Sequence, residues 1–209
     1  MLVNAIWDLD GTLFDTYPEM VTALHAVLTA QGVTISQAAL LVAIKRESIQ
    51  TTVTNYAQQL GVPIQGLLEA YHALERQTVM TARPYPEARM VLEAVKAAGG
   101  HNLLMTHRDR SAWALLQQAG LRDLFLDGVT SELALPRKPR PDAINYLLHQ
   151  DQLNPARTAM IGDRKLDVIA GQAAGVTGVY FNVDGLNDAP MADVSIDHLR
   201  ELVPLFSAR

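Results

Sequence analysis

Two aspartates near the N-terminus stand at a spacing that could support chemistry. Asp8 and Asp10 follow the apolar run from Val3 to Trp7 and are separated by one residue. Alternate side chains of an extended segment point to the same side, so the two carboxylates are expected about 7 Å apart. Such a pair disfavours joint ionisation unless a divalent cation or a division between nucleophile and proton carrier compensates. The alternative is a strand that ends in an ordinary Asp-Gly turn.

Two further polar clusters lie in the middle of the chain. Thr106 and His107 close an apolar stretch that begins at residue 102, and Lys138 stands before a proline and a predicted helix. Taken singly, a threonine in a strand or a lysine in a basic loop has a structural explanation. Their placement beside the ends of predicted elements is what makes them candidates for a shared site.

A fourth cluster follows the apolar stretch 158–161. It contains Asp163 and Asp167, whose spacing of four predicts that both lie on one face of the first turn of a helix. Alone, they could be acidic residues that the helix dipole favours at a helix N-terminus. Together with Asp8 and Asp10 they indicate a site.

Alternating strands and helices are expected to position these residues. Beyond residue 84 the apolar pattern predicts helices over 87–98, 111–119, 141–149 and 165–174, strands over 102–106, 124–129, 158–161 and 177–181, and a weak strand and helix within 194–206. Between residues 15 and 83 it predicts helices alone, from 17 to near 32 and over 38–46, 48–60 and 64–82. We therefore predict an α/β fold with a mostly parallel sheet, interrupted by a helical insertion, and a ligand site at the carboxyl ends of the strands.

Composition narrows the classes of function. The 209 residues carry a net charge of −5, which argues against a nucleic-acid-binding surface, and no apolar run reaches the length of about 18 residues that a membrane span needs. We expect no signal peptide, because no basic segment precedes the first apolar run. The absence of cysteine excludes disulfides and thiolate chemistry and fits a cytoplasmic protein.

The residue types of the clusters point to phosphoryl transfer. Asp8, Asp10 and Asp163 offer hard oxygen ligands, which suit Mg²⁺ rather than zinc. Lys138 adds a mobile positive charge, and Thr106 adds a hydroxyl donor. Three backbone N–H groups are expected to complete a cradle for the phosphate, those of Leu9, Gly11 and His107. Charge neutralisation and positioning of this kind are what phosphoryl transfer requires.

The chain resembles a haloacid dehalogenase (HAD) superfamily hydrolase, of the phosphoglycolate phosphatase-like group in subfamily IA. The resemblance rests on four motifs in order along the whole chain: Asp8-Leu9-Asp10-Gly11-Thr12, Thr106 after an apolar strand, Lys138 before Pro139, and the stretch Gly162-Asp163-Arg164-Lys165-Leu166-Asp167. It implies a Rossmann-like core from residues 1–14 and 85–209 and an inserted helical cap of the C1 type from residues 15–84.

The resemblance also implies a reaction. A magnesium-dependent phosphatase would hydrolyse a small phosphate monoester metabolite through an aspartyl-phosphate. Asp8 would attack phosphorus, while Asp10 would protonate the leaving alcohol and then activate water. Thr106 would hydrogen-bond the transferring phosphoryl group, and Lys138 would neutralise both that group and Asp8.

For the metal, the resemblance implies Mg²⁺ held by Asp8, by the backbone carbonyl of Asp10 and by Asp163. Asp167 would support these ligands through water or Lys138. Dehalogenases of this superfamily lack the acid/base aspartate, so the presence of Asp10 makes the resemblance imply phosphate ester chemistry rather than dehalogenation.

Several alternatives stay open from the sequence. A sugar phosphomutase of the same family, similar to β-phosphoglucomutase, would return the phosphate to a sugar, and a non-catalytic binding protein would merely keep the fold. In the cap, Lys45, Arg46 and Ser48 either contact the non-phosphate end of a substrate or form a solvated face, and Trp7 is expected to pack in the core. The protein is expected to be a monomer or a homodimer.

Overall fold

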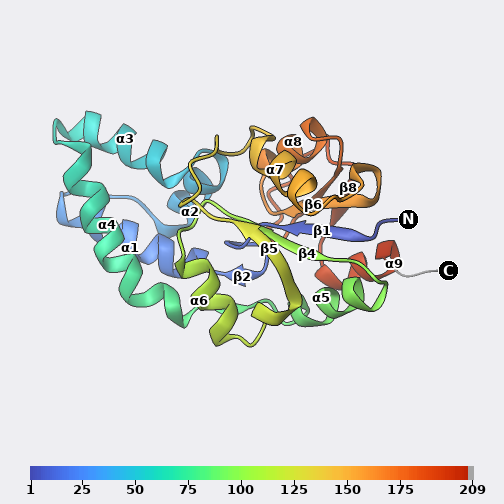
Figure 1. Ribbon diagram of the computed structural model, residues 1–209. Coiled ribbons are helices and arrows are strands. Elements are labelled where there is room, and N and C mark those ends of the chain that lie inside the picture. The colour runs from blue at the N-terminus through green and yellow to red at the C-terminus, as the bar shows by residue number, and fades with distance from the viewer. Residues whose placement is uncertain (207–209) are drawn as a thin grey trace. The chain divides into compact units, whose positions relative to one another are not determined.

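A six-stranded parallel sheet forms the centre of the computed structural model, which describes residues 1–206 (Figure 1). The strands are β1 (Asn4–Trp7), β4 (Asn102–Met105), β5 (Phe125–Val129), β6 (Thr158–Gly162), β7 (Thr177–Phe181) and β8 (Val194–Ile196). Their order across the sheet is β5-β4-β1-β6-β7-β8. The chain moves outward from β1 in one direction and then, at β6, in the other. The carboxyl ends of β1, β4 and β6 therefore meet at the switch point where open α/β sheets bind ligands.

The central strands are apolar because helices cover both faces of the sheet. Every residue of β1, β4 and β6 is buried, as expected for parallel strands. Ile6 of β1 pairs with Leu103 on one side and Met160 on the other. Trp7 is fully buried, and its indole N–H donates to the Asn102 side chain at 2.9 Å. The tryptophan is thus a core residue, as predicted.

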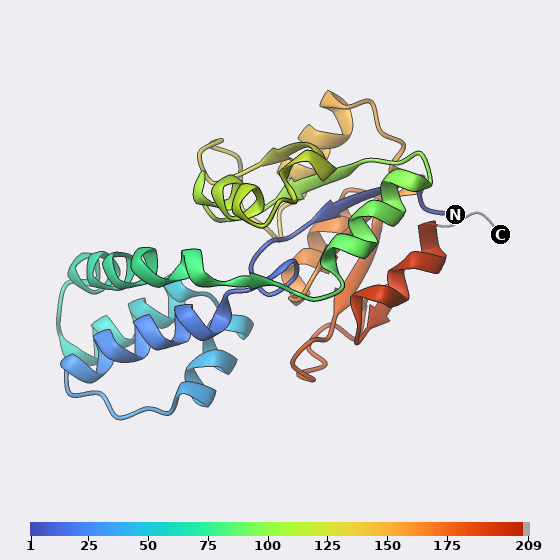
Figure 2. The same ribbon diagram turned by 90° about the horizontal axis from the view of Figure 1, so that it is seen from below.

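Five α-helices accompany the described part of this sheet. They are α5 (Ala88–Ala97), α6 (Ser111–Gln118), α7 (Asp142–Gln150), α8 (Lys165–Ala173) and α9 (Val203–Phe206). Figures 1 and 2 show α7 and α8 on one face of the sheet and α5, α6 and α9 on the other. Each predicted helix and strand of this part of the chain is present, and the bounds that differ do so by one residue.

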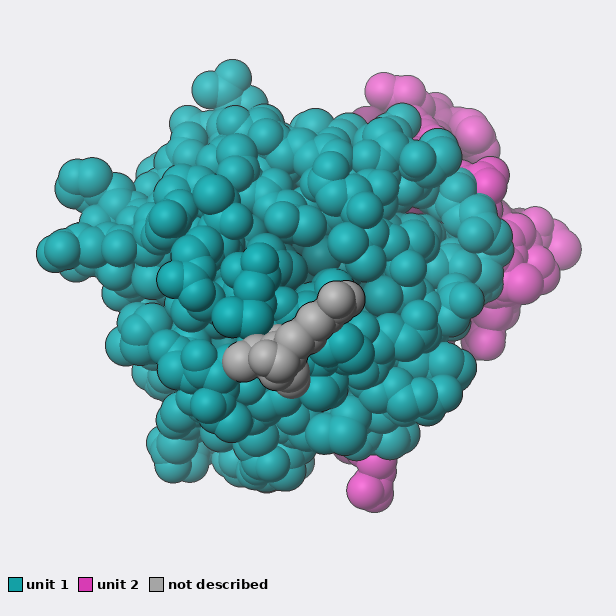
Figure 3. Space-filling view, turned by 90° about the vertical axis from the view of Figure 1, so that its right-hand side faces the viewer, with its two compact units in different colours: residues 1–14, 84–209 teal, residues 15–83 magenta. Residues whose placement is uncertain are grey.

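The chain divides into two compact units, coloured separately in Figure 3. One comprises residues 1–14 together with the chain from residue 84 onward, and the other comprises residues 15–83. Where the chain passes between them it forms two paired strands, β2 (Phe14–Asp15) and β3 (Arg83–Pro84). The sequence did not predict these strands, because two residues are too short to show a period.

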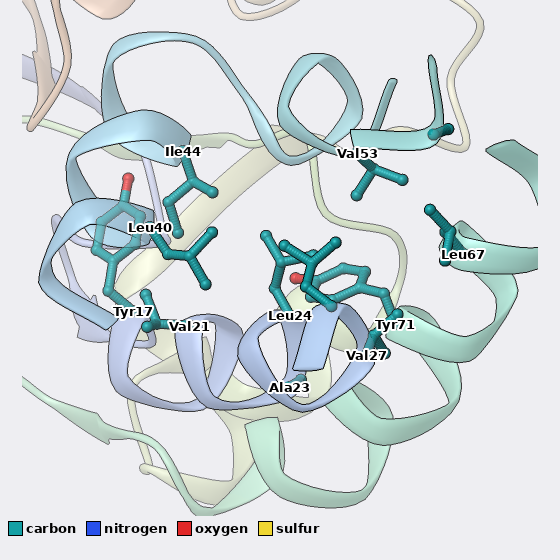
Figure 4. Packing of buried hydrophobic residues seen from close by; sticks show 12 residues of the cluster. Tyr17, Val21, Ala23, Leu24, Val27, Leu40, Ile44, Val53, Leu67 and Tyr71 are labelled. Atoms are coloured by element: carbon teal, nitrogen blue, oxygen red, sulfur yellow. The ribbon is translucent and has the colours of Figure 1, made fainter. Parts of the chain in front are cut away.

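The second unit contains four helices, α1 (Tyr17–Ala30), α2 (Gln37–Arg46), α3 (Ile49–Leu60) and α4 (Ile64–Thr78). All four contribute apolar side chains to one buried cluster, and Figure 4 shows Leu24, Leu40, Val53 and Tyr71 pointing toward one another. The predicted helix 64–82 is shorter than expected. It ends at Thr78 and continues as a 3-10 turn, η1 (Val79–Thr81), ahead of the extended segment that Pro84 favours.

Within residues 1–206, no helix combines the length and the apolar character that a membrane-spanning segment would need.

Candidate active site

Asp8 lies at the carboxyl end of β1, in the centre of the sheet edge. Its N–H donates to the carbonyl of Ile161 at 2.9 Å, so the ladder to β6 fixes the backbone that carries the carboxylate. The residue is buried, with 7% of its surface exposed. Beyond it, the carbonyl of Leu9 accepts the N–H groups of a tight turn.

Gly11 serves that turn. Its φ of 77° is in the left-handed region, and its N–H donates to the carbonyl of Phe14 at 2.7 Å. From the sequence we expected this N–H to face a phosphate. In the structure it is already used within the turn, so of the three expected backbone donors those of Leu9 and His107 remain as predictions.

Lys138 joins three parts of the site. Its Nζ lies 2.7 Å from Oδ1 of Asp8 and 2.6 Å from Oδ1 of Asp167, and it donates to the carbonyl of Met105 at 3.2 Å. The side chain is 2% exposed. From the sequence we expected a mobile positive charge at this position. The structure instead holds the ammonium group in a buried position between two carboxylates.

Asp163 and Asp167 reach the site from two different local structures. Helix α8 begins at Lys165, so Asp163 lies in the turn before the helix, and only Asp167 is in its first turn. The expectation that both lie in the first turn was therefore wrong, although the two carboxylates do converge. Asp167 accepts the N–H of Arg164 at 3.1 Å, and Asp163 accepts the hydroxyl of Thr12 at 3.1 Å.

Three carboxylates at this sheet edge have the composition of a metal site. Ligand oxygens of Asp8, Asp163 and Asp167 all lie within 4.8 Å of one another, and all three residues are buried. Buried carboxylates need compensating charge, and one lysine among three leaves a net negative charge. An oxygen-only cluster of this kind fits a hard divalent cation such as Mg²⁺.

From the sequence we expected Asp8, Asp163 and the backbone carbonyl of Asp10 to be the metal ligands. The carboxylate cluster contains Asp8 and Asp163, but its third member is different. Asp167 belongs to it, and its contact with Lys138 matches the supporting position that the resemblance implied. The side chain of Asp10 instead contacts an arginine. A role for the backbone carbonyl of Asp10 as a ligand stays a prediction.

The electrostatics of Asp8 agree with a need for a cation. Burial raises the pKa of Asp8 to about 8, and the carboxylates of Asp167 and Asp163 add to the rise, while Lys138 opposes it. For Lys138, burial lowers the pKa, but Asp167 and Asp8 more than offset this, so the pKa is raised and the lysine stays protonated. The ammonium group of Lys138 is shared between Asp8 and Asp167, and it thus does not fully compensate the buried charge of Asp8.

Arg108 contacts Asp10 through three hydrogen bonds. Its Nε donates to Oδ1 at 3.1 Å and to Oδ2 at 3.2 Å, and Nη2 donates to Oδ1 at 2.8 Å. The arginine side chain is 9% exposed and that of Asp10 is 20% exposed. Sequence reasoning missed Arg108. Its position two residues after Thr106, at the same strand end, was the available signal.

Thr106 and His107 follow β4 and have different roles. Thr106 is buried, and its hydroxyl oxygen accepts the N–H of Arg108 at 3.1 Å, which leaves the hydroxyl proton to be donated. The His107 ring accepts the backbone N–H of Lys138 at its Nε2, at 3.0 Å. Burial, followed by the charges of Lys138, Arg137 and Arg164, lowers the pKa of His107 to about 2. The imidazole is therefore neutral and holds the loop of Lys138.

The three candidate residues of the helical insertion have mixed roles. Lys45 is buried, and its ammonium group lies 4.8 Å from the centroid of the Tyr17 ring. Ser48 caps α3 by accepting the N–H of Thr51 at 2.9 Å. Both therefore have roles within their own unit. Arg46 is exposed, and its proposed contact with substrate stays a hypothesis.

The chain is similar to known enzymes over most of its length. The family model for haloacid dehalogenase-like hydrolases matches residues 5–181. The chain belongs to this family. It is 28% identical over 181 residues to a phosphoglycolate phosphatase of Vibrio vulnificus, which covers 81% of this chain and 78% of that protein. A second phosphoglycolate phosphatase of the same species is 27% identical and covers 94% of this chain and 92% of its own length.

Solved structures share the fold of this haloacid dehalogenase-like hydrolase. A haloacid dehalogenase-like family hydrolase from Streptococcus pneumoniae superposes with a TM-score of 0.82 at 19% identity and covers 99% of both chains. A HAD family hydrolase from Deinococcus radiodurans, solved with bound phosphate and sodium, gives a TM-score of 0.77 at 22% identity and covers 96% of this chain and 93% of that one. At these identities the likeness shows the fold.

Proposed function

We propose that this hydrolase is a magnesium-dependent phosphatase that acts on a small phosphate monoester. The observation that carries the proposal is the buried Lys138, which contacts both Asp8 and Asp167 within a cluster of three carboxylates at the sheet edge. The relatives in Vibrio vulnificus are phosphoglycolate phosphatases, which makes phosphoglycolate the first substrate to test.

In the first half-reaction, Asp8 attacks phosphorus. A bond forms between its carboxylate oxygen and phosphorus, the bond from phosphorus to the ester oxygen breaks, and Asp10 gives its proton to the leaving alcohol. Thr106 donates its hydroxyl proton to a phosphoryl oxygen, and Lys138 lowers the negative charge around Asp8. These groups are fixed before the substrate arrives, which is how electrostatic stabilisation is most effective.

In the second half-reaction, water attacks the phosphorus of the aspartyl-phosphate. Asp10 accepts a proton from that water, the bond between Asp8 and phosphorus breaks, and inorganic phosphate leaves. Asp8 and Asp163 would hold the metal, together with the backbone carbonyl of Asp10. When bound, Mg²⁺ would neutralise the carboxylates and the phosphoryl charge.

We further propose that residues 15–83 form a cap that closes over the site during turnover. An aspartyl-phosphate needs controlled access of water, and closure of a mobile unit is a common means of control. The two crossings of the chain, β2 and β3, would serve as hinges. We also propose that the enzyme is cytoplasmic, which the absence of cysteine from the sequence fits.

A sugar phosphomutase is not favoured. The two relatives named above are phosphoglycolate phosphatases.

Hydrolysis of p-nitrophenyl phosphate tests the proposal. We expect turnover that requires Mg²⁺, stops when the metal is chelated and is lost in Asp8→Asn. Asp142→Asn is the matched control, because this aspartate pairs with Arg140 on the surface at 3.1 Å. Wild-type turnover by Asp8→Asn would contradict the mechanism, and release of no phosphate from any ester would contradict the function.

A further inference from the structure

The contact between Arg108 and Asp10 has no role in the reaction described so far. Both residues belong to the same compact unit, and they lie 98 positions apart in the sequence. The backbone of Arg108 is itself fixed, since its N–H donates to Thr106 Oγ1 at 3.1 Å and its carbonyl accepts the N–H of Ser131 at 2.9 Å. A guanidinium group mounted in this way can set the orientation of the carboxylate that it binds.

The hydrogen bonds to the two carboxylate oxygens of Asp10 are unequal. Oδ1 accepts from Nη2 at 2.8 Å and from Nε at 3.1 Å, whereas Oδ2 accepts the longer, shared bond from Nε at 3.2 Å. Oδ1 is thus the anchored oxygen. Oδ2 is the oxygen better placed to carry a proton to a leaving group.

The guanidinium group of Arg108 would lie close to a leaving alcohol that Asp10 protonates. A proton carrier must come within about 3.2 Å of the oxygen that it protonates. Because Nε lies 3.2 Å from Oδ2, a leaving oxygen at Oδ2 would lie only about one further hydrogen bond away from Arg108. A change at Arg108 is therefore expected to affect proton transfer to the oxygen of the ester bond that breaks.

We propose that Arg108 is a positioning residue, which anchors Oδ1 of Asp10 so that Oδ2 faces the ester oxygen and delivers its proton as the bond to phosphorus breaks. This inference rests on the proposed function, in which Asp10 is the proton carrier. The exposed Arg110 on the same loop serves no such role, since it pairs with Glu132 on the surface and its side chain is 84% exposed.

The test compares two substrates that need the proton to different degrees. Alkyl phosphates have a poor leaving group and depend on proton donation, whereas p-nitrophenolate leaves without it. We expect Arg108→Gln to lower kcat/KM for glycerol 2-phosphate at least about tenfold more than kcat/KM for p-nitrophenyl phosphate, as part of the 10²–10⁴-fold that a general acid contributes. Arg108→Lys keeps the positive charge but lacks the planar guanidinium group that binds both carboxylate oxygens. It should therefore bring the ratio of the two kcat/KM values only part of the way back to that of the wild type.

The ratio is measured on one preparation of each variant, so a loss of folded protein cancels. Arg110→Gln is the matched control and should keep the wild-type ratio. Equal losses on both substrates would overturn the proposal, because they indicate a purely structural contact. A gain on the alkyl ester would also overturn it, because Arg108 would then restrain Asp10. If the wild type with Mg²⁺ hydrolyses neither ester, it is the proposed function that fails.

Discussion

His107 stabilises the site as a neutral ring. Its Nε2 accepts the N–H of Lys138, and burial lowers its pKa to about 2 in the folded protein, against about 6.5 in an unfolded chain. Above pH 6.5 neither state binds a proton there. As the pH falls below 6.5, the unfolded state gains a proton that the folded state excludes, so this group makes the folded protein less stable.

We therefore predict a pH-dependent difference between the wild type and His107→Gln. Between pH 6.5 and pH 5 the wild type should lose up to about 1.4 kcal/mol of unfolding free energy per pH unit more than the variant. Urea denaturation at pH 7, 6 and 5 measures this, with the exposed His149→Gln as control. Parallel pH profiles for wild type and His107→Gln would contradict the burial argument.

The residues also show what the sequence can and cannot predict. The types of Asp8, Thr106, Lys138 and Asp163, placed at the ends of apolar stretches, were enough to predict a common site. The bond between Arg108 and Asp10 was not predictable, because it joins two loops whose separation depends on how β1 and β4 pair. Two arginines, Arg108 and Arg110, lie in that loop. The position of Arg108 two residues after Thr106 made it a candidate for the site, but it did not indicate a bond to Asp10.

At the scale of elements, the turn between β6 and α8 determines where Asp167 lies. A Cβ on Gly162 would clash with the carboxylate of Asp167. We predict that Gly162→Ala displaces Asp167, destabilises the protein by about 1–3 kcal/mol and lowers phosphatase activity. Urea denaturation and the rate with p-nitrophenyl phosphate measure the two effects.

Gly66→Ala is the matched control for this variant. Gly66 lies within α4, and the place that a Cβ would take there is open, so alanine should stabilise the protein by about 0.5–1 kcal/mol. Wild-type stability and activity in Gly162→Ala would show that the close approach of Asp167 is not required.

The parallel sheet and its helices followed from the sequence because buried strands read as apolar runs between amphipathic segments. The short strands β2 and β3 did not, since each has only two residues and depends on pairing with the other. The start of α8 at Lys165 was predicted, but the expectation that Asp163 lies in its first turn was wrong. The stretch from Asp163 to Asp167 has the spacing of a helix, yet the turn that follows Gly162 delays the helix until Lys165.

At the scale of the whole molecule, the metal is expected to couple the site to global stability. A ligand at 100 times its Kd stabilises the folded state by about 2.7 kcal/mol. We predict that Mg²⁺ raises the unfolding free energy of the wild type by about this amount and that Asp163→Asn abolishes most of the gain. Thermal and urea unfolding with and without Mg²⁺ measure it, and Asp142→Asn should behave as the wild type. A full response in Asp163→Asn would remove this residue from the metal site.

The central claim is that Asp8 forms a covalent bond to phosphorus. The most direct measurement is rapid acid quenching during turnover of p-nitrophenyl phosphate with Mg²⁺, followed by intact-protein mass spectrometry and peptide mapping. We predict one added phosphoryl group per chain, located on Asp8 and absent from Asp8→Asn. Turnover without this adduct, or an adduct on another residue, would contradict the account.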